Sequence, residues 1–212
     1  EKLWGAQFAS IITGLSSNST ETVIGLLSGE IKLFDSKGSC IYSRVPVAEG
    51  NGIAYGTALS SDGNHIAAVC GTSPQRLVIM TRGGANFRKP AYTVLDTDMR
   101  RPVFIGFMPD NDFILVESPD ALLLKKIDDS APGKVPLSGR LSSVTMREDH
   151  TIFVTSSIRG KEGYSDIRFI KAPGNLLFRE IVKSGRVFIR CTASFMIMCF
   201  DEALFVFEME VV

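Results

Sequence analysis

The sequence predicts an all-β protein built from repeated units of four short strands. Apolar runs rich in Val, Ile, Leu and Phe alternate with clusters of Gly, Pro, Asn, Asp and Ser along all 212 residues. No segment shows the 3.6-residue apolar period with capping residues that a surface helix requires. In addition, one strand–turn–strand outline returns at regular intervals, which indicates that the strands form similar units.

Two kinds of turn mark the repeat. The polar turn of the outline falls at Asp62, Asp110 and Asp149, with spacings of 48 and 39 residues. The turn after the following strand falls at four positions: Asp35, Thr81, Asp128 and Lys171. Its spacings are 46, 47 and 43 residues. A period of roughly 40 to 47 residues is typical of a four-stranded β-propeller blade.

Five units follow from these markers, and the two ends of the chain complement each other. The fifth unit, RVFIRCT, FMIMCF and ALFVFEMEV, lacks a fourth strand, whereas a spare strand, Lys2 to Phe8, precedes the first unit. We expect this spare strand to pair antiparallel with Ala203 to Glu210, because such pairing removes two open sheet edges. An alternative is a part of a longer array of seven or eight blades.

The predicted fold is therefore an all-β, five-bladed β-propeller of four-stranded antiparallel blades, closed by the N-terminal strand, which completes the C-terminal blade. Residues 1–212 are expected to form a single domain, because all-β domains of this length are often undivided.

Two segments, SSDGNHIAAV and GEIKLFDSKGSCIYS, resemble the repeats of WD40-like and PQQ-like β-propellers. Those families share a turn of the type SPDG, an apolar strand and then the pattern G-x-I-x-L-F-D-x-x-G. Asp62-Gly63 matches the turn, and the pattern is matched by Gly29, Ile31, Leu33, Phe34, Asp35 and Gly38. The chain lacks the Trp-Asp pair of the first family and the repeated docking tryptophan of the second. The resemblance therefore implies the architecture, no quinone cofactor and no particular activity.

Charge and composition exclude two classes of protein. Lys plus Arg and Asp plus Glu each number 23, so the formal net charge is zero, unlike that of a dedicated nucleic-acid binder. No run of about 18 apolar residues is present, so no membrane span is expected.

The chain opens with Glu1 and not with Met, which indicates that a targeting segment or another part of a longer chain was removed. A periplasmic or secreted location is the corresponding expectation.

The cysteines and histidines indicate neither a disulfide nor a metal site. With a turn near Ala193-Ser194, Cys191 lies opposite Met196 and Cys199 lies opposite Phe188, so the two thiols do not meet. The two histidines, His65 and His150, both occupy turn positions in units that are not adjacent. No metal and no cofactor are predicted.

The expected inner strands lack the acidic residues that glycosidases use for catalysis. Glycosidases with five-bladed folds place two carboxylates there, but the five expected inner strands contain neither Asp nor Glu. No catalytic residue is therefore predicted. The alternative is a hydrolase or lyase with loop-borne catalytic residues, chiefly on the long connection from Ser156 to Asp166.

Arginines stand out at one end of the predicted units. Arg101, Arg140 and Arg186 each end a connection that leads into an inner strand, so blade symmetry should place them at one mouth of the channel. Arg76 and Arg159 belong to loops that open on the same face. Because guanidinium groups bind carboxylate and phosphate with paired hydrogen bonds, we expect a non-enzymatic binding or scaffold module. It would recognise a protein partner or an anionic ligand; the oligomeric state is left open. Acidic residues, among them Asp166 and Asp201, are expected on the same face, so the alternative is that each arginine pairs with a nearby carboxylate such as Asp98, Asp201 or Glu202.

Overall fold

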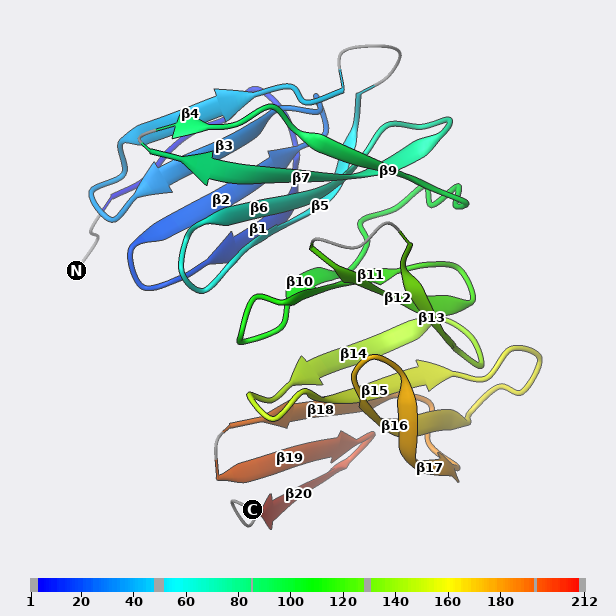
Figure 1. The fold of residues 1–212 in the computed structure, drawn as a ribbon. Coiled ribbons are helices and arrows are strands. Elements are labelled where there is room, and N and C mark those ends of the chain that lie inside the picture. Colours follow the sequence, from blue (N-terminus) through cyan, green and yellow to red (C-terminus); the bar gives the residue numbers. More distant parts are fainter. Residues whose placement is uncertain (1–3, 48–51, 85, 128–130, 193, 210–212) are drawn as a thin grey trace. The chain divides into compact units, whose positions relative to one another are not determined.

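The computed structural model describes residues 4–47, 52–84, 86–127, 131–192 and 194–209. Every regular element in this described part is a β-strand, and the strands form five antiparallel sheets (Figure 1). This confirms the all-β class, and the five sheets fit the five predicted blades. The chain divides into two compact units, residues 1–118 and 119–212, so the single-domain assignment stays a prediction.

The first unit contains two complete sheets. The first sheet has the order β1 (Ile12–Ser17), β2 (Glu21–Leu26), β3 (Ile31–Asp35) and β4 (Cys40–Arg44). The second sheet has the order β5 (Ala54–Leu59), β6 (His65–Cys70), β7 (Gln75–Gly83) and β9 (Ala91–Leu95). The short strand β8 (Asn86–Phe87) pairs with the end of β7 across a turn in which Gly84 has a φ of 75°. Glycine suits this hairpin turn, because it adopts a positive φ without steric cost.

The remaining sheets follow the same order along the chain. The third sheet runs β10 (Ile105–Phe107), β11 (Phe113–Glu117), β12 (Ala121–Lys126) and β13 (Gly133–Pro136), and the division between the units falls after β11. The fourth sheet, in the second unit, runs β14 (Leu141–Met146), β15 (Thr151–Ser157), β16 (Ser165–Lys171) and β17 (Asn175–Val182). The fifth contains three strands among the described residues, β18 (Val187–Cys191), β19 (Phe195–Phe200) and β20 (Ala203–Glu208).

The polar turns that revealed the repeat share one conformation. Asp62, Asp110 and Asp149 each use the Oδ1 atom to accept a hydrogen bond from the backbone N–H two residues further on, at 3.0, 3.2 and 3.0 Å. The residue after each aspartate has a positive φ, 72°, 65° and 65° in turn. Gly, Asn and His tolerate that conformation better than most residues, and the aspartate replaces a backbone acceptor. The sequence repeat is therefore a repeat of turn geometry.

Hydroxyl groups on the first or second strand of a sheet connect it to the next sheet. In the first unit the Ser16 hydroxyl accepts a hydrogen bond from the Leu59 N–H at 3.1 Å. In the second unit Ser143 accepts one from the Ile189 N–H at 3.0 Å, and Thr155 donates one to the Val187 carbonyl at 2.6 Å. These bonds satisfy backbone groups that no strand pairs with, and they fix neighbouring sheets in register.

The N-terminal segment differs from the prediction. Residues 4–8 form no strand, and Lys2, Leu3 and Glu210 of the expected pairing lie outside the described residues. Trp4 stacks on Phe34 of the first sheet with ring centroids 5.7 Å apart, and Phe8 meets the same ring edge-on at 5.9 Å. Trp4 and Phe8 thus pack on the cluster of Ile24, Leu26 and Phe34, and this burial of aromatic surface stabilises the observed position of the segment. The closure of the fold by this segment therefore stays a prediction.

The cysteine register is confirmed. Cys191 pairs with Met196, and Cys199 pairs with Phe188, across β18 and β19. All four cysteines are free thiols. Burial raises the pKa of Cys191 to about 11 and that of Cys70 to about 12, so both are inert under ordinary conditions.

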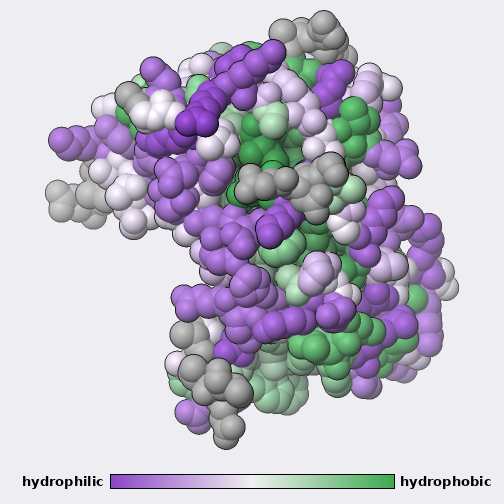
Figure 2. Space-filling model, viewed as in Figure 1, coloured by the Kyte–Doolittle hydropathy of each residue, from purple (hydrophilic) through white to green (hydrophobic). Residues whose placement is uncertain are grey.

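An unusually apolar surface follows the outer strand β17. Figure 2 shows hydrophobic side chains gathered over this part of the second unit. Leu176, Leu177 and Phe178 are 55%, 60% and 43% exposed. Arg179 and Glu180 are the charges within the strand, which limits edge-to-edge association with other chains.

Replacing Thr57 by valine is expected to stabilise the first unit by about 1–2 kcal/mol. The Thr57 hydroxyl is buried and finds no hydrogen-bond partner among the described residues, a situation that costs about 1–3 kcal/mol. Valine has nearly the same shape and no polar atom. Chemical denaturation measures the change; Thr155→Val, which removes a hydroxyl bonded to Val187, is the matched control and should destabilise the protein. A loss of stability in Thr57→Val would contradict the expectation.

Candidate anion-binding site

Two connections in the second unit carry the same three residues. Ser138-Gly139-Arg140 leads into β14, and Ser184-Gly185-Arg186 leads into β18, 46 residues later. At Gly139 the backbone passes so close to β15 that an added Cβ would lie 2.6 Å from the Ser157 carbonyl oxygen. The first of these turns thus requires glycine, and the arginine that follows it is held at the start of a strand.

A carboxylate from the β19–β20 turn holds the second Ser-Gly-Arg turn. Asp201 accepts hydrogen bonds from the Ser184 hydroxyl at 3.0 Å and from the backbone N–H of Gly185 at 3.2 Å. Its other oxygen accepts the Arg186 N–H at 3.4 Å. The Ser184 hydroxyl and then the Gly185 N–H hold the pKa of the Asp201 carboxyl below its usual value. Asp201 therefore carries its charge at neutral pH and defines the turn.

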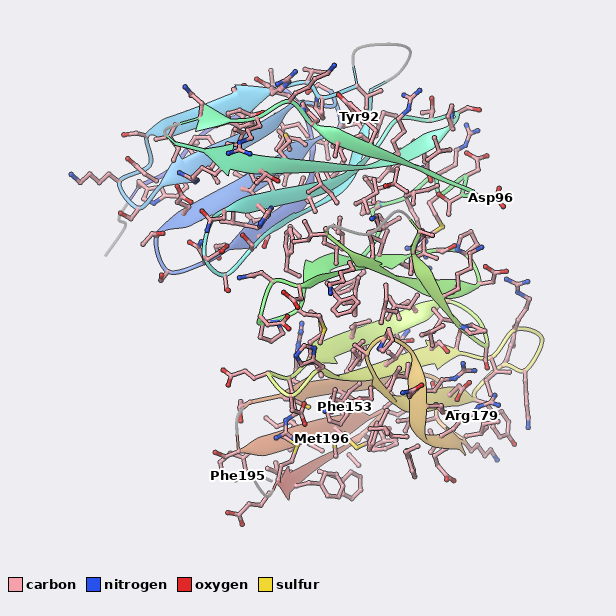
Figure 3. All side chains as sticks on the ribbon, viewed as in Figure 1. Tyr92, Asp96, Phe153, Arg179, Phe195 and Met196 are labelled. Carbon is pink, nitrogen blue, oxygen red and sulfur yellow. The ribbon has the colours of Figure 1, made fainter. Side chains whose placement is uncertain are left out.

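Asp166, at the start of β16, holds the first turn from inside the protein. Its side chain is fully buried and accepts a hydrogen bond from the Ser138 hydroxyl. The Arg168 guanidinium lies 2.6 Å from the same carboxylate, and the Arg179 guanidinium, labelled in Figure 3, lies 3.1 Å from it. Burial alone would raise the pKa of the Asp166 carboxyl, but the hydrogen bonds from Arg168, Arg179 and Ser138 outweigh burial and lower it.

Arg140 and Arg186 keep their guanidinium groups available. Asp166 and Asp201 are occupied by serine hydroxyls, backbone amides or other arginines. Within the described part of the chain, neither Arg140 nor Arg186 forms an ion pair, and both residues are exposed. Two cations without local compensation favour a bound anion.

The two arginines line one pocket of about 360 Å³. Its wall is formed by the start of β14, the end of β15 and the start of β18, with the residues Arg140, Leu141, Ser142, Ser157, Gly185, Arg186 and Phe188. The Ser157 hydroxyl accepts the Arg140 N–H at 3.0 Å, which fixes the backbone at the wall. Phe188 is 46% exposed and adds an apolar surface. The pocket thus combines two cations and hydroxyls with an apolar side, which suits an anionic group attached to an apolar one.

The other predicted arginines have different surroundings. Arg159, in the same unit, donates its backbone N–H to the Ser138 carbonyl at 2.9 Å, so it lies beside the first Ser-Gly-Arg turn. Arg101, in the first unit, places its guanidinium 2.5 Å from the buried carboxylate of Glu117. Glu117 also accepts the Phe104 N–H at 3.0 Å, so Arg101 is part of an internal ion pair. Arg76, also in the first unit, is a partly buried residue of β7.

Sequence reasoning selected the arginines and missed the residues that position them. Ser138 and Ser184 were not predicted, although the repeated Ser-Gly-Arg triplet was a readable signal for them. Asp166 and Asp201 were expected only as acidic residues on the same face, and their hydrogen bonds to the serines were not. The aspartates follow the serines by 28 and 17 residues, and no local pattern links them.

The described part of the chain offers few residues that could catalyse a reaction or bind a metal ion. The observed first strands β1, β5, β10, β14 and β18 contain neither Asp nor Glu. Asp166, at the end of the long loop that was the alternative catalytic region, is buried and ion-paired and so is not free to act as a base.

Among the described residues no group of three or more His, Cys, Asp or Glu could hold a metal ion. No helix in this part is long and apolar enough to cross a membrane.

The chain belongs to the β-propeller proteins, because a family model described as "beta-propeller protein" matches residues 1–210. An uncharacterized protein of Treponema pallidum (strain Nichols) is 23% identical over 114 residues, which cover 54% of this chain and 30% of that protein. The solved structure of the Dos1 propeller matches with a TM-score of 0.68 at 12% identity, over 94% of this chain and 56% of the other. The chain thus spans about a third and about half of the length of these two proteins. The matches support a β-propeller and not specifically WD40-like or PQQ-like repeats.

Proposed function

We propose that this chain is a non-enzymatic binding module that recognises an anionic group of a protein partner at the Arg140–Arg186 pocket. The observation that carries the proposal is the pair of Ser-Gly-Arg turns. Each turn is held by its own aspartate, and the two arginines line one pocket without a carboxylate partner among the described residues. Arg159 lies beside the first of these turns; the binding roles expected of Arg76 and Arg101, which lie in the first unit, stay predictions.

Preorganisation supports this proposal. A side chain that is already positioned loses less conformational entropy when a ligand binds, and Asp166, Asp201 and Ser157 fix the backbone on both sides of the pocket. A guanidinium group that has no internal partner can give two hydrogen bonds to a carboxylate without breaking an existing ion pair. Leu141 and Phe188 offer apolar contact to a neighbouring side chain of the partner.

Changing both arginines to glutamine (Arg140→Gln with Arg186→Gln) is expected to weaken binding of an acidic probe at least about tenfold. Each charge-assisted hydrogen bond contributes about 1.5–3 kcal/mol, and about 1.4 kcal/mol corresponds to a factor of ten. The probe is a capped six-residue peptide with one glutamate, two glutamines and one phenylalanine, titrated into the full chain by calorimetry. The measured quantity is the dissociation constant at low salt.

The matched control is Arg147→Gln, which removes one positive charge at the other end of β14 and should leave the dissociation constant unchanged. Far-ultraviolet circular dichroism and thermal melting establish that the variants fold like the parent. Equal affinity of the parent and the double variant would refute the pocket as the binding site. A change in the mass of the peptide after incubation would instead support the hydrolase or lyase alternative.

A further inference from the structure

Two guanidinium groups contact the first Ser-Gly-Arg turn, and two further arginines belong to it or lie beside it. Arg179 Nη2 lies 3.3 Å from the Ser138 hydroxyl, and Arg168 Nη2 lies 2.9 Å from the same atom. Arg159 donates its backbone N–H to the Ser138 carbonyl, and Arg140 is two residues further along the chain. The turn at the edge of the pocket therefore brings in three arginines that do not line the pocket itself, namely Arg159, Arg168 and Arg179.

The charges of this region do not balance. Five arginines line the pocket or form hydrogen bonds at the first Ser-Gly-Arg turn: Arg140, Arg159, Arg168, Arg179 and Arg186. The two aspartates, Asp166 and Asp201, are the carboxylates that bind these turns, which leaves three positive charges in the set. Two arginines share the single carboxylate of Asp166, and the Arg179 side chain is 45% exposed. Arg179 can therefore bind a second anion while it stays on Asp166.

We propose that the partner presents a short acidic segment with several carboxylates, one in the Arg140–Arg186 pocket and at least one more on Arg159 and Arg179. This inference rests on the proposed function, because it specifies the ligand of the same pocket. An extended chain advances about 3.3 Å per residue, so an acidic residue one to three positions from the pocket reaches the turn at Ser138. The phenyl ring of Phe188 takes an apolar side chain of the same segment.

A flanking carboxylate favours a short segment over a long polyanion. Glu202 follows Asp201 and is exposed. A nucleic acid, with one phosphate per nucleotide over many residues, would be repelled at this position. The chain as a whole carries no net charge, which also disfavours binding of a long polyanion.

The test compares two capped peptides on the full chain by calorimetry. One has one glutamate, two glutamines and one phenylalanine; the other has three glutamates in place of the single glutamate and two glutamines. We expect the three-glutamate peptide to bind about three- to tenfold more tightly at low salt, and the difference to shrink at high salt. In Arg179→Gln and, separately, in Arg159→Gln, the advantage of the three-glutamate peptide should fall while the affinity for the one-glutamate peptide is kept. Arg147→Gln should alter neither affinity.

Each outcome has a defined meaning. If both peptides bind the parent equally and Arg140→Gln with Arg186→Gln abolishes both, the acidic-segment inference is wrong and the proposed pocket stands. If neither peptide binds, both the acidic-segment inference and the proposed function are wrong. If a single-stranded oligonucleotide of six residues binds more tightly than the three-glutamate peptide, the assignment to a protein partner is overturned. Arg159→Gln guards against a folding defect in Arg179→Gln, because its described contact is made by the backbone.

Discussion

Asp166→Ala should lower the free energy of unfolding by about 3–5 kcal/mol, because it leaves two arginines without their shared buried carboxylate. The Asp166 side chain is fully buried, so water does not replace the lost acceptor. The Ser138 hydroxyl loses its partner as well, which releases the turn that carries Arg140. Urea unfolding followed by circular dichroism measures the change.

Asp149→Ala is the matched control for this prediction. Asp149 also lies near two cations, Arg147 at 4.0 Å and Lys171 at 3.9 Å, but its side chain is 46% exposed. Exposed pairs contribute at most about 1 kcal/mol, and the lost hydrogen bond from the Thr151 N–H adds about 1 kcal/mol, so this substitution should cost no more than about 2 kcal/mol. Equal losses in the two variants would contradict the structural role of Asp166.

The pH dependence of stability has a definite sign at Asp166. Its folded-state pKa lies below the unfolded value of about 3.9, so the unfolded state binds the proton more readily. The stabilisation is therefore fully present above the unfolded pKa and is lost as the pH falls through the folded pKa. The parent should lose stability on acidification in this range, and Asp166→Ala should lose correspondingly less.

Glu117→Ala should cost about 2–4 kcal/mol in the first unit. The Glu117 side chain is 5% exposed and lies 2.5 Å from Arg101, which is 33% exposed, so solvent screens this pair only in part. The substitution also removes the acceptor of the Phe104 N–H. Denaturant unfolding of the full chain provides the measurement.

An exposed ion pair nearby supplies the control for Glu117. Asp98 and Arg100 lie 3.0 Å apart with side chains 63% and 71% exposed, so Asp98→Ala should leave the unfolding free energy nearly unchanged. Comparable losses in Glu117→Ala and Asp98→Ala would show that burial does not govern the Arg101 pair. The account of why Arg101 differs from Arg140 would then fail.

Local chemistry made the repeat predictable from the sequence. The turns at Asp62, Asp110 and Asp149 depend on an aspartate and a residue that tolerates positive φ, both of which are adjacent in the chain. Strand order within each sheet follows from short turns, which join neighbouring antiparallel strands. The cross-strand register of Cys191 and Cys199 followed from the position of one turn.

Features that depend on contacts between residues far apart in the chain could not be predicted from the sequence. The N-terminal segment could complete a sheet edge or cover an apolar face, and the contact of Trp4 with Phe34 depends on tertiary packing. Likewise, Arg101 and Arg140 occupy similar positions in the repeat, yet Glu117 binds the guanidinium in one case and Asp166 binds the preceding serine in the other. The Ser-Gly pair that precedes Arg140 and not Arg101 is the local difference, whereas the two carboxylates, Glu117 and Asp166, lie 16 and 26 residues beyond their arginines.

The most direct test of the binding account is site-resolved NMR of the arginine side chains. The Nε–H signals of Arg140 and Arg186 are assigned by substitution and followed while the one-glutamate peptide is added to the full chain. The account predicts saturable shifts of both signals with one dissociation constant, and unchanged signals for Arg101, which Glu117 holds, and for Arg147. Shifts confined to other arginines, or a lack of saturation at Arg140 and Arg186, would contradict it.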